Sequence, residues 1–118
     1  MLNFHEYVNY GFWALQFTVG IIFIVHGWGK LKAPEQIASA YGAPKAVGTL
    51  HGLVEMIGGF LLITNFFVQI VAIVFGIIML GAIYYKVAKW HVPFMAYDKT
   101  GWEFDLLILA SCIAILLK

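Results

Sequence analysis

Six ionisable side chains stand in or beside long apolar stretches of the chain, and their chemistry needs an explanation. They are His26, Lys30, His51, Glu55, Glu103 and Asp105. An ionisable group inside a membrane span costs about 3 kcal/mol at the bilayer centre, so it usually faces other helices, where it is paired or lines a cavity. Imidazole, ammonium and carboxylate groups that face one another can form ion pairs and exchange protons. These six residues are therefore the candidate polar site.

The composition predicts that the elements carrying these residues are membrane-spanning helices. The chain has 118 residues, of which 63% are hydrophobic and 11% charged, whereas about a quarter of the residues of a soluble domain are charged. The apolar residues form four runs, and about 20 residues are needed to cross the hydrocarbon core. We therefore predict an all-α membrane protein, an antiparallel bundle of four transmembrane helices that forms a single domain over residues 1–118. The predicted spans cover 10–31, 44–64, 66–87 and 102–117, the last of them short.

The connections contain turn signals. Pro34 suits the first position of a helix, Gly42 suits its end, and Pro44 suits the start of the next one. This pattern predicts a short interfacial helix between the first two spans. A tight turn is predicted at Asn65, between the second and third spans.

The lysines predict the orientation of the chain in a cell membrane. Lys118 lies beyond the fourth run, while the other six lysines border the first and third connections: Lys30, Lys32, Lys45, Lys86, Lys89 and Lys99. Because lysine and arginine mark the cytoplasmic side, both termini are predicted outside and these two connections inside. The formal net charge of +1 argues against nucleic acid as a partner.

Glycines share a helix face with the candidate polar residues. At about 100° per residue, Gly20 and Gly27 fall on one stripe with Lys30, and glycines of the second span fall within about 60° of Glu55. Glycine lets helix backbones approach closely. The predicted helix-packing residues are Gly20, Gly27, Gly48, Gly52 and Gly59. Antiparallel spans would bring all six ionisable residues to the cytoplasmic side, so one connected cluster is predicted there.

No motif identifies a catalytic residue or a metal site. The sequence lacks HExxH and CxxC, and Cys112 lies in an apolar run where a packing role is favoured. Haem would need two opposed imidazoles, which disfavours binding through His26 and His51. A quinone head group could lie beside the polar residues and aromatics such as Trp28 and Trp102. The chain is therefore expected to carry no cofactor of its own, with quinone as the alternative.

Three motifs in order resemble those of a known family. They are "GWGKL" from Gly27, "EMIGGFLLI" from Glu55 and "GWEFDLLIL" from Gly101. On these residues the chain resembles the DoxX-like family of small four-span membrane proteins. Many relatives carry an arginine in the first span where Gln16 stands here, so a role for such an arginine does not transfer.

The resemblance implies a function at the level of class. The DoxX and DoxD proteins are associated with thiosulfate:quinone oxidoreductase activity. The expected function is an accessory or structural subunit of a larger membrane oxidoreductase complex, with the lipid bilayer and larger subunits as partners. Any redox chemistry would then come from a partner or a bound cofactor. The alternatives are a stand-alone redox protein that binds quinone or haem, and a transporter or assembly factor.

Overall fold

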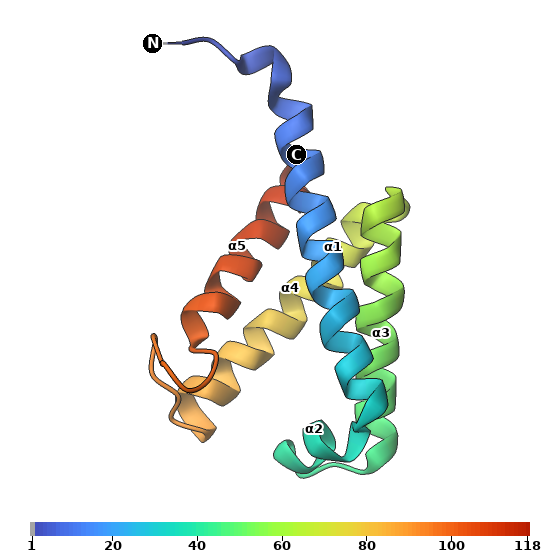
Figure 1. Ribbon diagram of the computed structural model, residues 1–118, viewed down its shortest axis with the longest axis vertical. Helices are drawn as coiled ribbons and strands as arrows, with labels where there is room; N and C mark the ends of the chain where they lie inside the picture. Colours follow the sequence, from blue (N-terminus) through green and yellow to red (C-terminus); the bar gives the residue numbers. More distant parts are fainter. Residues whose placement is uncertain (1) are drawn as a thin grey trace. The chain divides into compact units, whose positions relative to one another are not determined.

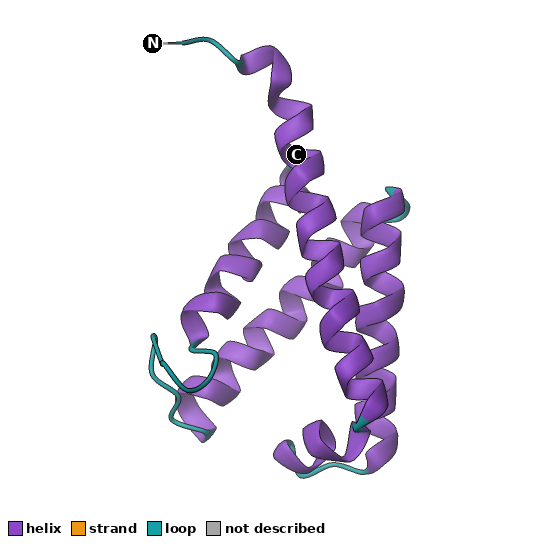
Figure 2. Ribbon diagram, viewed as in Figure 1, coloured by secondary structure: helices purple, strands orange, loops and turns teal. Residues whose placement is uncertain are grey.

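The regular structure of the chain is helical. The computed structural model describes residues 2–118, and Figures 1 and 2 show helices joined by short turns and one longer loop. In chain order, the elements are a 3-10 turn at His5–Tyr7, α1 at Val8–Lys32, α2 at Pro34–Ala40, α3 at Lys45–Thr64, α4 at Val68–Tyr84, a π-helical turn at Tyr85–Lys89 and α5 at Trp102–Leu117. The chain forms two compact units, one ending at Phe67 and the other running from Val68 to Lys118.

Three helical segments within residues 2–118 are long and apolar enough to cross a membrane. They are His5–Lys32, Lys45–Ile63 and Val68–Lys89, with 28, 19 and 22 residues. Helix α5 has 16 residues, about 24 Å at 1.5 Å per residue, which is shorter than the roughly 30 Å hydrocarbon core. The all-α class is thus confirmed, while the bundle of four crossings and the single domain stay predictions.

Glycines hold the first unit together by letting α1 and α3 run antiparallel at backbone contact (Figure 1). A Cβ atom on Gly20 would lie 2.8 Å from the carbonyl oxygen of Gly59, and one on Gly59 would lie 2.6 Å from that of Gly20. Gly27 and Gly52 face each other in the same way, at 2.6 and 2.9 Å. Any side chain at these four positions would push the helices apart, so the seam depends on glycine.

The predicted short helix between the first two spans is present as α2. Pro34 is its first residue, and Gly42 adopts a φ of +66° two residues after its end. Pro44 then caps α3 in an extended conformation, with φ −65° and ψ 155°. Helix α2 packs against α3, where Gly48 contacts the Pro34 carbonyl so closely that a Cβ would overlap it.

The second unit pairs α4 with α5 through a loop of residues 90–101. The π-helical turn ends α4 with hydrogen bonds from the Trp90 amide to the Tyr85 carbonyl and from Val92 to Lys86, each 2.7 Å. Gly101 is buried against the backbone of Pro93 and Phe94, where a Cβ would not fit. Helix α5 therefore starts at a fixed place relative to the end of α4. Cys112 is a buried free thiol, which agrees with a packing role.

The helices differ from the predicted spans at several ends. Helix α1 begins at Val8, two residues before the apolar run, because a helix can continue through a polar and aromatic segment. Helix α4, the third predicted span, begins at Val68 and not at 66. Asn65 and Phe67 have φ values of 65° and 52°, which interrupt a right-handed helix. Its α-helical part ends at Tyr84, and the π-helical turn carries it to Lys89.

Asn65 makes the predicted turn and is fixed by Gln16. It lies in the left-handed region at the end of α3, and its Oδ1 accepts a 2.9 Å hydrogen bond from the buried amide of Gln16. The same Gln16 nitrogen donates to the Leu62 carbonyl at 2.8 Å. Gln16 thus ties α1 to the last turn of α3.

Two substitutions at Asn65 should separate the contribution of its hydrogen bond to stability from that of its left-handed backbone conformation. Asn65→Gly keeps the backbone conformation and removes the hydrogen bond, so we expect a loss of about 1 kcal/mol of unfolding free energy. Asn65→Ala adds the cost of a left-handed Cβ, about 1 to 2 kcal/mol more. Unfolding titrations in mixed detergent micelles would measure both. Equal stability of the two variants would contradict the backbone contribution.

Candidate functional site: a buried ion pair in the α1–α3 seam

Lys30 and Glu55 form an ion pair inside the first unit. The Lys30 Nζ lies 2.5 Å from the Glu55 Oε1, and the Glu55 side chain is 2% exposed. The His51 Nε2 lies 3.5 Å from the same oxygen, one turn earlier on α3. A buried carboxylate is costly unless it is paired, and here the paired charge comes from Lys30 on the opposite helix, while the imidazole of His51 lies close by on the same helix. These three residues form the ion-pair cluster.

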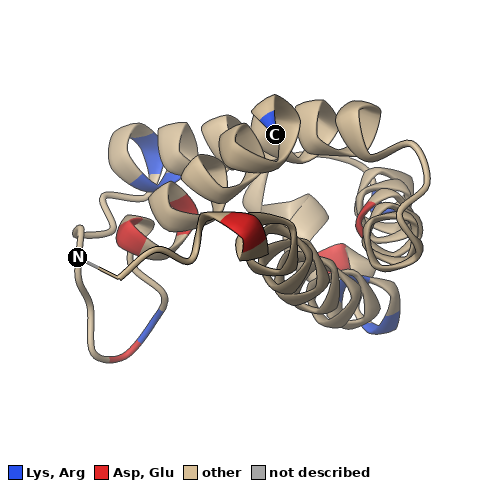
Figure 3. Cartoon of the chain, turned by 90° about the horizontal axis from the view of Figure 1, so that it is seen from above, with Lys and Arg blue, Asp and Glu red and all other residues tan. Residues whose placement is uncertain are grey.

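The glycine seam positions this cluster. Gly52 lies between His51 and Glu55 in sequence, and a Cβ there would meet the Gly27 carbonyl and, at 3.1 Å, the Lys30 Cβ. The close approach of the two backbones brings the lysine stem against α3, so its ammonium reaches the carboxylate. Figure 3 shows how few charged residues interrupt the otherwise uncharged ribbon. Lys30 and Glu55 thus place one positive and one negative charge together in an otherwise apolar and glycine-rich seam.

An open hollow of about 420 Å³ lies beside the cluster, between the end of α1 and α2. It is lined by His26, Gly29, Lys30, Ala33, Gln36 and Ile37. His26 is exposed on α1, so it belongs to the rim of this hollow, while Lys30 belongs both to the hollow and to the ion pair. Gly29 borders open space, since a Cβ on it would meet no atom within 4 Å.

The other two predicted site residues lie in the second unit, where Asp105 has a partner that the sequence did not suggest. Its Oδ2 lies 2.6 Å from the Lys86 Nζ, with the two side chains 7% and 16% exposed. Glu103 is exposed. The structure brings Lys30, His51 and Glu55 together, and it pairs Asp105 with Lys86. That all six residues form one cluster stays a prediction.

Two functional contacts were missed by the sequence reasoning. Lys86 was used only to predict orientation, although it lies near the end of one apolar run and Asp105 lies near the start of the next, so that the lysine and the acid are on consecutive predicted spans, as Lys30 and Glu55 are. Gln16 was noted as the position where the resemblance suggests an arginine, and its bonds to Leu62 and Asn65 depend on the length of α3. Among residues 2–118, no group of three or more histidine, cysteine, aspartate or glutamate side chains is arranged to hold a metal ion.

Asp105 and Glu103 offer a test of the second ion pair. Asp105→Ala leaves the Lys86 ammonium largely buried and unpaired, so a loss of about 2 kcal/mol of unfolding free energy is expected. Glu103→Ala removes an exposed carboxylate and should change stability by less than about 0.5 kcal/mol. Detergent unfolding monitored by circular dichroism gives both values. Similar losses in the two variants would argue against a special role for the Lys86 pair.

Long apolar helices, a glycine seam and buried ion pairs define a small helical membrane protein. The DoxX family model matches residues 12–88. A protein of Bacillus subtilis (strain 168), named "Putative oxidoreductase CatD", is 33% identical over 102 residues, which cover 84% of this chain and 72% of the relative. The chain belongs to the DoxX family. No solved structure matches it significantly.

Proposed function

We propose that this chain is a membrane-embedded accessory subunit of a larger membrane oxidoreductase complex. The observation that carries the proposal is the internal pairing of the buried polar groups. Lys30 with Glu55, and Lys86 with Asp105, neutralise each other within their own units. Such pairs stabilise helix contacts and supply no electron carrier. The relative named as an oxidoreductase supports redox function, which in this proposal is supplied by the partner subunits.

The experiment compares the chain alone with the chain in its native membrane. Tagged chain is purified in mild detergent, and co-purifying subunits are identified together with their quinone-linked activity. Deletion of the chain should lower that activity in membranes, and the wild-type chain should restore it. The rival hypothesis is an autonomous redox protein. It would be established by isolated chain that carries stoichiometric haem, metal or quinone and oxidises a quinol without another subunit.

The proposed orientation places both termini outside and residues 33–44 and 90–101 in the cytoplasm. It is supported by the position of the lysines at these connections. A cysteine at the exposed Lys99, in a Cys112→Ser background that removes the native thiol, should react with a membrane-impermeant maleimide only after the membrane is opened. Labelling of this cysteine in intact cells would contradict the proposed orientation and indicate the opposite one.

A further inference from the structure

Glu55 has polar neighbours toward one end of the α1–α3 seam and apolar ones toward the other. Toward the α1–α2 connection lie Lys30 and His51. From Glu55 to Leu62 on α3, a rise of about 10 Å, the buried positions between the two helices are apolar side chains or glycines, namely Val19, Gly20, Phe23, Gly58, Gly59 and Leu62, and the buried Gln16 follows at the far end, where its amide donates to the Leu62 carbonyl. Such a segment offers no side chain that can pass a proton. Within the first unit, the side chains that contact Glu55 and can pass a proton therefore lie toward the connection end.

Lys30 stands between the buried carboxylate and the open hollow. Its side chain is 18% exposed and lines the hollow, while its ammonium contacts the Glu55 Oε1. The hollow, at about 420 Å³, is much larger than one water needs, and His26 and Gln36 give water polar partners. An ammonium has three N–H donors, so Lys30 can bind water and Glu55 together.

We propose that this hollow is a water-filled entry through which Glu55 takes up and releases a proton from the side of the α1–α2 connection alone, with Lys30 as the gate. In the uptake step, a hydronium ion in the hollow transfers its proton to the Glu55 carboxylate. The products are a water molecule and a neutral carboxylic acid. Lys30 keeps its proton and its charge, and its ammonium turns into the hollow, where water and the Gln36 amide oxygen accept its N–H groups.

The groups around Glu55 are consistent with this step. Lys30 from α1 and His51 from α3 are the charged and titratable groups in contact with the carboxylate. Glu35 of α2 is exposed, so it leaves the carboxylate without a second buried acid beside it. The inference does not depend on the accessory role proposed above.

The first test is infrared spectroscopy of the full chain in lipid vesicles while the pH is lowered and restored. Glu6, Glu35 and Glu103 are exposed, and replacing all three by glutamine leaves Glu55 as the sole glutamate. With glutamate labelled by carbon-13 at the carboxyl group, a reversible, isotope-shifted acid carbonyl band is expected. The band should vanish in Glu55→Gln and remain in Asp105→Asn, which alters the matched pair in the second unit.

The second test blocks the entry. Gly29 lines the hollow and borders open space, so Gly29→Phe should fill the hollow without moving the backbone. After a rapid pH drop, the Glu55 band should rise several-fold more slowly in this variant. Gly11→Phe is the matched control, because Gly11 lies on the same helix, also borders open space and does not line the hollow.

Two results would overturn the proposal. A folded chain that shows no glutamate acid band over the pH range in which it stays folded would exclude proton uptake at Glu55. A Gly29→Phe variant whose band rises as fast as that of the wild type would exclude the hollow as the route. Because the triple glutamine variant leaves the ion pair untouched, the first result does not depend on whether Glu55→Gln folds.

Discussion

Glu55→Ala should lower the unfolding free energy of the chain by about 3 kcal/mol, because it leaves the Lys30 ammonium in the α1–α3 seam without its carboxylate. The side chain of Lys30 is 18% exposed, so solvent relieves part of the cost, which places the value at the lower end for broken buried pairs. Unfolding in mixed micelles, monitored by circular dichroism, would measure the loss.

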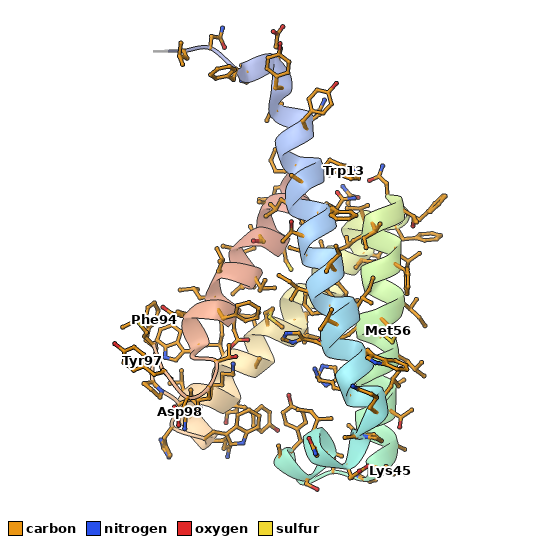
Figure 4. All side chains as sticks on the ribbon, in the orientation of Figure 1. Trp13, Lys45, Met56, Phe94, Tyr97 and Asp98 are labelled. Carbon is orange, nitrogen blue, oxygen red and sulfur yellow. The ribbon has the colours of Figure 1, made fainter. Side chains whose placement is uncertain are left out.

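Two variants control for this result. Asp98→Ala removes a carboxylate that is exposed in the loop before α5 (Figure 4), and it should be almost neutral. The double variant Glu55→Leu with Lys30→Met removes both charges and should be more stable than Glu55→Ala alone, since no unpaired charge remains. A double variant as unstable as the single one would mean that packing around Glu55, and not charge, determines the loss.

Gly27→Ala should destabilise the chain and Gly29→Ala should not, although the two glycines lie only two residues apart. A Cβ on Gly27 would lie 2.6 Å from the Gly52 carbonyl oxygen and 2.9 Å from the backbone nitrogen of Met56, a residue of α3 labelled in Figure 4. Backbone atoms of a packed helix cannot yield locally, so we expect a loss of about 3 kcal/mol from overpacking.

At Gly29 a Cβ meets no atom within 4 Å, and alanine favours helix more than glycine by up to about 1 kcal/mol. Gly29→Ala should therefore be neutral or slightly stabilising. The same unfolding titration measures both variants. A Gly27→Ala protein as stable as the wild type would show that α1 and α3 can separate without cost, which would contradict the glycine seam.

Much of the first unit could be predicted because its signals are local. Pro34, Gly42 and Pro44 mark the ends of helices through backbone conformation alone. The shared face of Gly20 and Gly27 on the first span, and that of Gly52 and Glu55 on the second, follow from 3.6 residues per turn. The same geometry placed Lys30 and Glu55 on facing stripes. Their pairing needed only the further assumption that consecutive spans are antiparallel.

The contacts that could not be predicted depend on where a helix stops. Gln16 reaches Leu62 and Asn65 because α3 ends level with it, and Lys86 reaches Asp105 because a π-helical turn and a fixed loop set the start of α5. The size and position of the hollow depend on how α2 lies against the end of α1, which carries Lys30. Such features arise from tertiary packing and loop geometry, on which periodicity carries no information.

Each unit of this chain contains both members of its own ion pair, and this has a consequence for biosynthesis. Lys30 lies on α1 and Glu55 on α3, so the two can neutralise each other before α4 leaves the ribosome. The later pair of helices likewise supplies both Lys86 and Asp105. Neither unit therefore needs a residue of the other to neutralise its buried charge, so each can complete its ion pair as soon as its own helices have left the ribosome.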